Sequence, residues 1–315
     1  MIKTFKTLAD LMITFSDNQV ALDHFRAIRW RDGEFCPYCG HDKVYTPKKG
    51  NRFGCPQCKN KFSILVGTIF ENSKLPLKVW FGAIWLLTNH PKGIASTTLA
   101  RDLGISQKSA WFVLHRLRHA ARTQSFNTPP MRGEVEIDET FVGGKARSMH
   151  GRRKGKGGGA VGMTPIIGAK ERHGAVVARV VSTGVGRPDA QRFFDAVVSP
   201  DAKLVVTDTG VAYRAIEGFP QHRTLNHAKG EYAKGEIHTQ SIESVWSLLK
   251  RQIVGTHHWV SEKHLQQYVS EMTWRMSHRD LTSQERINAL FSDVEGRLTY
   301  KALTDDKSQR VETQA

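Results

Sequence analysis

The four cysteines of this chain constrain its fold more than any other feature, because all of them lie in two C-x-x-C pairs. Fifteen residues separate Cys39 from Cys55, which lets the two pairs close on one tetrahedral Zn²⁺ ion. A redox-active pair and four ordinary buried cysteines are the alternatives. Because sulfur fills all four positions, we expect a structural zinc, held by Cys36, Cys39, Cys55 and Cys58 in a zinc ribbon over residues 33–72.

Composition points to a folded protein with a polyanionic partner. The chain has 315 residues, of which 39% are hydrophobic, so it can form more than one domain. Its formal net charge of +16 indicates nucleic acid as the first candidate partner, and a generally basic, solvated surface is the alternative. The longest apolar run, 79–87, is too short to cross a bilayer, and the first residues lack a signal-peptide pattern. We therefore expect a cytoplasmic protein with no membrane partner.

The spacing of apolar residues and turn signals predicts a multi-domain chain. A small zinc ribbon and a helical region are followed, after a proline-containing linker, by an α/β domain. We divide the chain into an N-terminal helical segment (1–32), the ribbon (33–72), a helix-turn-helix region (73–128), the α/β domain (133–292) and a polar tail (293–315).

Within the α/β domain, strands come first and helices later, which is typical of a mixed sheet covered by helices. The candidate strands are 134–142, 163–170, 175–183, 203–208 and 222–226. The candidate helices are 188–198, 209–216, 239–254 and 261–277.

Residues 97–118 have the pattern of a DNA-binding helix-turn-helix. Ala100 is small where two helices would cross, Gly104 suits a left-handed turn, and Ser106 can cap the second helix. An ordinary helical hairpin would look the same, but the basic composition favours DNA binding. The side chains that we expect to face DNA are those of Gln107, Lys108, Ser109, Arg116 and Arg118.

Three acidic residues form the candidate catalytic group. Asp138 lies in an alternating strand, Asp208 ends an apolar strand, and Glu243 lies early in a helix. Such carboxylates can hold two divalent cations for phosphodiester chemistry, and without cations they would raise one another's pKa. A trio of solvated surface charges is the alternative. We therefore predict a site for Mg²⁺ or Mn²⁺ made by Asp138, Asp208 and Glu243.

Other polar residues near this trio are candidates for supporting roles. Lys250 follows Glu243 by two helical turns and, with Arg251, would lie near phosphates; a solvated basic face is the alternative. His227 could be a ligand, a phosphate contact or a local hydrogen-bonding residue. Glu139 points to the opposite face of its strand from Asp138 and suits a structural role.

The segment 145–159 carries several cations and glycines but no acid. It could be a DNA-contacting loop or a solvated insertion. The residues in it that we expect to contact DNA are Arg152, Arg153 and Lys154.

Taken together, these motifs resemble one family. The chain is similar to bacterial insertion-sequence transposases of the DDE superfamily, in the branch with an N-terminal zinc ribbon. The motifs that carry the resemblance are 35–40, 62–63, 67–70, 137–145, 207–208, 226–227, 242–251, 255–258 and 263–268. This chain departs from the family pattern at Thr209, where relatives commonly have glycine, and near Ser277, where relatives commonly have asparagine.

The resemblance implies an RNase H-like catalytic domain that nicks the ends of its element and joins the freed 3′-OH to target DNA. It implies that Asp138, Asp208 and Glu243 bind the catalytic Mg²⁺ or Mn²⁺, that His227 and Lys250 support them, and that the cysteines hold zinc. Double-stranded DNA at the bacterial nucleoid is the expected partner, bound by a homo-oligomer. The alternatives are a non-catalytic zinc-ribbon and helix-turn-helix regulator, and a related nuclease that cuts without strand transfer.

Overall fold

The computed structural model describes residues 2–47, 50–143, 162–181, 184–226, 233–235 and 237–305. The chain forms two compact units, which we treat separately. The first comprises Met1–Thr123 together with His278–Thr304, and the second is built on Gln124–Ser277. In the described parts of the chain, no helix is both long and apolar enough to cross a membrane.

The first unit combines a small cysteine-containing ribbon with a bundle of helices. The helix α3 (Leu77–Asn89) is buried along most of its length and contacts α1 (Leu8–Thr14), α2 (Asn18–Arg29) and α4 (Ser96–Leu103). Side chains define the starts of the outer helices: Thr7 and Asp10 form a capping box for α1, and Asp17 caps α2. The remaining elements are the two short strands β1 (Phe53–Gly54) and β2 (Lys61–Phe62) and the long helix α5 (Gln107–Phe126).

The C-terminal helices return to this first unit. Helix α9 (Ser283–Ser292) contacts α2 and α3, and its Phe291 ring lies 4.6 Å from Phe81 and 5.6 Å from Phe25. The short helix α10 (Tyr300–Thr304) follows it. The sequence-based division placed α9 with the α/β domain and α10 in a polar tail. The structure differs because the buried face of α9 completes the aromatic core of the first unit.

A buried histidine in this core predicts a pH-dependent stability. The His24 side chain is fully buried beside Phe15 and Phe81, and its Nδ1 accepts a hydrogen bond from the Lys3 amide at 2.9 Å. Burial lowers the pKa of His24 from 6.5 to about 4. Since the folded-state pKa lies below the unfolded value, the stabilisation is complete above pH 6.5 and is lost as the pH falls toward 4.

We therefore expect acid to destabilise the first unit by up to about 3 kcal/mol over this range. Unfolding by denaturant between pH 7 and 4 measures this, with His24→Phe as the non-titrating comparison. If the two proteins lose stability in parallel over this range, His24 is not the responsible group.

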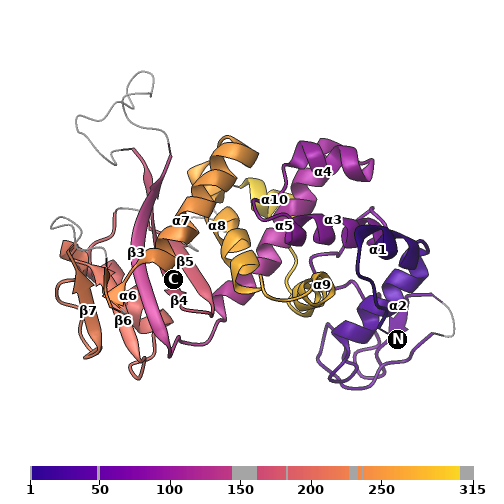
Figure 1. The fold of residues 1–315 in the computed structure, drawn as a ribbon. Coiled ribbons are helices and arrows are strands. Elements are labelled where there is room, and N and C mark those ends of the chain that lie inside the picture. The colour runs from indigo at the N-terminus through magenta and orange to yellow at the C-terminus, as the bar shows by residue number, and fades with distance from the viewer. Residues whose placement is uncertain are drawn as a thin grey trace. The chain divides into compact units, whose positions relative to one another are not determined.

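The second unit is built on a five-stranded mixed sheet in the order β5-β4-β3-β6-β7 (Figure 1). The strand β3 pairs antiparallel with β4 and parallel with β6; β4 pairs antiparallel with β5, and β6 parallel with β7. This is the RNase H-like arrangement, and the predicted mixed sheet is confirmed. The strands are β3 (Glu134–Val142), β4 (Thr164–Glu171), β5 (Val176–Val180), β6 (Leu204–Asp208) and β7 (His222–Leu225).

Helices cover both faces of the sheet, and a separate hydrophobic core lies between the sheet and the helices on each face. On one face, Val135 and Ile137 of β3 join the core formed with α6 (Arg187–Val197) and the 3₁₀ turn η3 (Val211–Tyr213). On the other face, Val142 joins the core formed with α7 (Gln240–Gln252) and α8 (Glu262–Ser277). Because alternate residues of a strand point to opposite faces, Glu136 and Asp138 face α7.

Short elements complete this unit. The hairpin β8 (Ala233–Lys234) and β9 (Ile237–His238) precedes α7, and a π-helical turn η5 (Ile253–His257) follows it. The edge strand β5 is covered by α8, because Val180 and Val176 donate their amide hydrogens to Gln266 Oε1 and Ser277 Oγ at 2.7 and 2.9 Å. The Ser277 hydroxyl thus accepts a hydrogen bond from a backbone amide at the edge of the sheet.

Candidate functional site

The fold brings Asp138 and Asp208 together at the centre of the sheet. The strands β3 and β6 pair in parallel, with Val135 opposite Val205 and Glu136 opposite Val206. Continuing this register by two residues brings Asp138 level with Asp208, the last residue of β6. Side chains at equivalent positions on neighbouring parallel strands lie side by side, so the two carboxylates are neighbours.

The electrostatics of Asp138 agree with this proximity. Burial, followed by the negative charges of Glu139 and Asp208, raises the pKa of Asp138 to about 7, against an opposing hydrogen bond from Trp246. A carboxylate in such surroundings is stabilised in its charged form by a cation. The arrangement therefore suits a hard divalent ion with oxygen ligands.

Asp208 is held by a close backbone contact with Gly210. The amide of Gly210 donates to Asp208 Oδ1 at 2.8 Å, and a Cβ atom on Gly210 would lie 2.8 Å from the same oxygen. The family pattern has glycine one position earlier. Here Gly210 makes the close approach, so Thr209 is compatible with an oriented carboxylate.

Glu139 is a further acid beside the pair. It lies on the opposite face of β3 from Asp138, as predicted, and accepts a short hydrogen bond from the Tyr213 hydroxyl. Burial and the negative charge of Asp208 raise the pKa of Glu139, against the Tyr213 bond. The contact with Tyr213 could not be predicted from the sequence, because it joins β3 to a turn 74 residues away.

Glu243 lies in the first turns of α7, with its side chain exposed, and accepts a hydrogen bond from the Thr239 hydroxyl at 3.0 Å. Among the described residues, Asp138, Asp208 and Glu243 do not form a group whose ligand atoms all lie within 4.8 Å of one another. The structure therefore brings the two aspartates together and leaves Glu243 on the adjoining helix.

Trp246, on the same helix α7 as Glu243, is hydrogen-bonded to Asp138. Its Nε1 donates to Asp138 Oδ2 at 3.0 Å, and its ring lies over Gly168, the β4 residue paired with Asp138. A Cβ atom on Gly168 would be only 2.4 Å from Trp246 Cη2. The indole can approach Asp138 because position 168 has no side chain.

We expect Gly168→Ala to displace Trp246 and to destabilise the second unit by about 1–3 kcal/mol. Denaturant unfolding followed by tryptophan fluorescence measures both effects. Gly255→Ala is the control, because a Cβ atom there would meet no atom within 4 Å. Equal stability of the two variants would contradict the close packing of Trp246 on Gly168.

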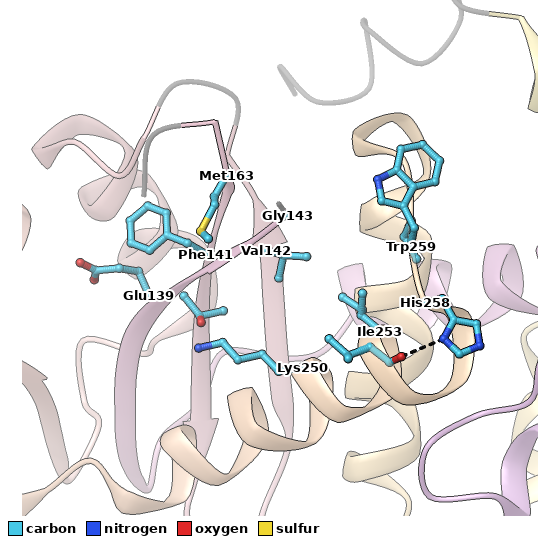
Figure 2. A pocket seen from close by; sticks show the side chains of 12 residues that line it. Glu139, Phe141, Val142, Gly143, Met163, Lys250, Ile253, His258 and Trp259 are labelled. Atoms are coloured by element: carbon cyan, nitrogen blue, oxygen red, sulfur yellow. Dashed lines mark hydrogen bonds between the residues drawn. The ribbon is translucent and has the colours of Figure 1, made fainter. Parts of the chain in front are cut away.

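Lys250 lines a cavity of about 660 Å³ together with Glu139 (Figure 2). The exposed Trp259 and the β3 residue Phe141 line it as well. Figure 2 shows Lys250 reaching from α7 toward β3. Arg251 is exposed and donates to the Ser247 carbonyl at 3.2 Å.

Several predicted residues lie outside the described residues, namely His227 and the basic-loop residues Arg152, Arg153 and Lys154.

The four cysteines form a second candidate site, for a metal. The Sγ atoms of Cys36 and Cys58 lie 3.7 Å apart, those of Cys39 and Cys55 lie 3.6 Å apart, and all four lie within 4.8 Å of one another. A zinc ion with four Zn–S bonds of about 2.3 Å needs S···S separations of about 3.8 Å. The four thiols therefore fit a tetrahedral Zn²⁺.

The turns around the two cysteine pairs differ in the residue that adopts a left-handed backbone. Beside the first pair this residue is Gly40, with φ of 74°. In the second pair the left-handed residue is Lys59, with φ of 61°, whereas Gly54 lies in β1.

The helix-turn-helix region keeps the predicted turn. Gly104 is left-handed with φ of 63°, and Ser106 Oγ accepts the Ser109 amide at 3.2 Å as a cap. At the start of α5, Gln107 and Lys108 are exposed. Gln107 donates to Ser96 Oγ at 2.9 Å, and Lys108 lies over the Tyr300 ring. This first turn of α5 is accessible to a partner.

The structure corrects the prediction for Arg116 and Arg118, which are 5% and 1% exposed. The Arg116 guanidinium donates to the carbonyl oxygens of Ile69, Glu71 and Leu298. It therefore joins segments of the first unit. Sequence alone could not reveal this, because these carbonyls belong to segments distant in the chain.

Comparison with known proteins identifies the two regions. Residues 130–277 match the ISXO2-like transposase domain, and residues 16–61 match the transposase zinc-ribbon domain. An uncharacterized protein in transposable element ISH50 of Halobacterium salinarum is 28% identical over 276 residues, which cover 81% of this chain and 90% of that protein.

Two solved structures show weaker similarity. A chain in the pre-cleavage Mos1 transpososome is 10% identical, with 69% of this chain and 79% of that chain covered and a TM-score of 0.24. A chain in the Mos1 Strand Transfer Complex is 11% identical, with 70% of this chain and 79% of that chain covered and a TM-score of 0.21. On the two domain matches, the chain belongs to the ISXO2-like DDE transposases that carry an N-terminal transposase zinc ribbon.

Proposed function

We propose that this transposase binds the terminal inverted repeats of its insertion sequence, cleaves DNA strands there and joins the freed ends to target DNA. The observation that carries the proposal is the register that makes Asp138 and Asp208 neighbours at the centre of the sheet. With Glu243 they are the proposed ligands of Mg²⁺ or Mn²⁺. When bound, such ions activate the attacking oxygen and stabilise the leaving oxygen.

The proposed reaction has two steps of the same kind. In cleavage, a water oxygen bonds to the scissile phosphorus, the P–O3′ bond breaks, and the 3′ oxygen leaves with a proton as a 3′-OH. In transfer, that 3′-OH loses its proton as its oxygen bonds to a phosphorus of the target strand, the target P–O3′ bond breaks, and the target 3′ oxygen gains a proton and leaves as a 3′-OH. The chain's carboxylates orient the site, and the Lys250 cation offsets negative charge on a neighbouring phosphate.

DNA recognition is assigned to the first unit. The first turn of α5, in which Gln107 and Lys108 are exposed and Ser109 is half-buried, is the proposed contact with the element ends. The cysteine cluster, loaded with zinc, holds the ribbon together. The net charge of +16 supports a DNA partner. Because two ends must be joined to one target, we propose that a homo-oligomer acts on them.

A cleavage and joining assay tests this function. The purified protein is incubated with duplexes that carry the element's own ends and with a supercoiled plasmid. We expect nicks that expose 3′-OH ends and covalent joining to the plasmid, both dependent on Mg²⁺ or Mn²⁺. Binding without cutting in either metal would support a DNA-binding regulator instead, and cutting without joining would support a nuclease.

A further inference from the structure

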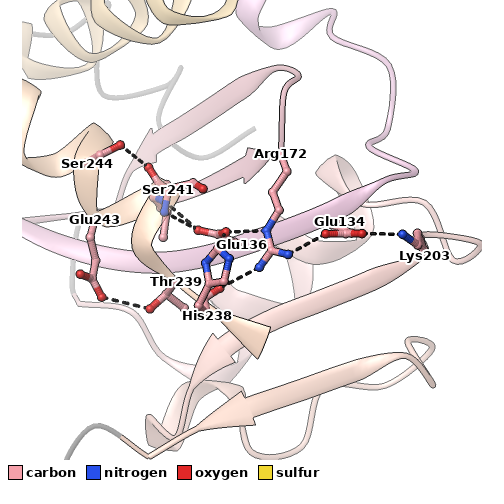
Figure 3. A network of polar contacts seen from close by, with 10 residues as sticks. Glu134, Glu136, Arg172, Lys203, His238, Thr239, Ser241, Glu243 and Ser244 are labelled. Carbon is pink, nitrogen blue, oxygen red and sulfur yellow. Dashed lines mark hydrogen bonds and ion pairs between the residues drawn. The ribbon is translucent and has the colours of Figure 1, made fainter. Parts of the chain in front are cut away.

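Glu136 is a fully buried carboxylate that caps the helix bearing Glu243 (Figure 3). Its Oε2 accepts the backbone amides of Ser241 and Ile242 at 2.7 and 3.1 Å. These amides belong to the first turn of α7, where helical N–H groups have no partner within the helix. The residue at the usual capping position, Thr239, makes no capping bond, since its hydroxyl donates to Glu243 instead. Glu136 therefore supplies from β3 the acceptor that α7 lacks.

Arg172 completes this attachment. Its Nε donates to Glu136 Oε1 at 2.8 Å, and its Nη1 donates to Glu134 Oε2 at 2.6 Å. Its Nη2 donates to the carbonyl oxygen of His238 at 3.3 Å, just before α7. The segment that leads into α7 is thus held to β3 by a buried carboxylate and by the cation that neutralises it.

The positions of these contacts matter for the candidate site. Glu136 and Asp138 are two residues apart on the same face of β3, and both reach α7. Glu136 holds Ser241 and Ile242, whereas Asp138 holds Trp246. Glu243 lies between these two attachments. Three hydrogen bonds at two points on β3 therefore fix the Glu243 backbone relative to Asp138.

We infer that Glu136 is a positioning residue for the active site, which places the Glu243 ligand relative to Asp138 by anchoring the first turn of α7. This inference rests on the proposed catalytic role of Asp138 and Glu243. In this assignment the fully buried Glu136 acts through α7 and does not itself bind metal or DNA. Removing its charge should weaken metal binding more than it lowers the rate at saturating metal.

The chain offers a matched control. Glu134 lies on the same strand and pairs with the same Arg172, but its other partner is Lys203 and not α7. The test compares Glu136→Gln with Glu134→Gln in the full chain. The readouts are hydrogen exchange of the Ser241 and Ile242 amides, the Mn²⁺ concentration for half-maximal cleavage, the rate at saturating Mn²⁺, and affinity for the element ends.

For Glu136→Gln we expect faster exchange of the two amides and a rise of about 10-fold or more in the half-maximal Mn²⁺ concentration. Saturating Mn²⁺ should restore most of the rate, and DNA affinity should be unchanged. Glu136→Asp, which keeps the charge, should recover part of the Mn²⁺ affinity. Glu134→Gln should match the wild type in all four readouts.

Two results would overturn the inference. One is unchanged exchange of the Ser241 and Ile242 amides in Glu136→Gln. The other is faster exchange with an unchanged Mn²⁺ requirement, since Glu136 would then stabilise the helix without placing a ligand. A wild-type protein that binds DNA but never cleaves it would instead refute the proposed function, and the exchange comparison would still decide whether Glu136 anchors α7.

Discussion

Replacement of Asp138 by asparagine is expected to lower the rate of DNA strand cleavage by on the order of 10³-fold, with little change in DNA affinity. The amide keeps the size of the side chain and can still accept the Trp246 hydrogen bond, but it removes a negative charge that a divalent cation needs. Asp208→Asn should have a similar effect, because Asp208 lies level with Asp138. The measurement is single-turnover cleavage of a labelled end, with binding followed by gel shift.

Asp201→Asn is the control for this prediction. Asp201 is exposed and precedes β6 at the end of the strand opposite to Asp208. Its variant should cleave at the wild-type rate. Comparable losses at positions 201 and 208 would mean that the effect is not specific to the acid pair.

Replacement of Cys55 by serine is expected to disorder the ribbon, because Cys55 is buried and provides one of the four clustered thiols proposed to bind zinc. Structural zinc contributes roughly 10–16 kcal/mol of apparent binding free energy in small zinc domains, so its loss exceeds the stability of most domains. We expect one zinc per wild-type chain by elemental analysis, and in the variant a loss of zinc, of ordered ribbon signals and of DNA affinity.

Gln57→Ala serves as the comparison, since Gln57 is exposed between Cys55 and Cys58. It should keep the zinc and the fold. Wild-type protein that contains no zinc, or that keeps an ordered ribbon after complete chelation, would contradict a structural metal site.

Strands and the cysteine cluster are features of this fold that the sequence predicts correctly. A period of two in Glu134–Val142 predicted the strand, and the apolar run ending at Asp208 predicted β6. The cysteine spacing likewise predicted a group of four thiols that the structure brings together. These features are local, because strand period and knuckle spacing depend on neighbours in the chain.

The features that sequence reasoning missed depend on distant partners. Arg116 had the pattern of an exposed DNA-binding cation, yet its guanidinium contacts carbonyls at Ile69 and Leu298. The capping of α7 by Glu136 joins residues 105 positions apart. Neither periodicity nor residue type identifies such partners, since any of several acids or carbonyls could satisfy the same group.

The central claim is that Asp138, Asp208 and Glu243 hold the catalytic cations, and Mn²⁺ binding to the protein on an uncleaved DNA end tests it most directly. Electron paramagnetic resonance titrations would compare the wild type with Asp138→Asn, Asp208→Asn and Glu243→Gln. We expect specific Mn²⁺ binding in the wild type and about a 10-fold or greater loss of Mn²⁺ affinity in each variant. Equal Mn²⁺ affinity in the wild type and all three variants would show that the cations bind elsewhere.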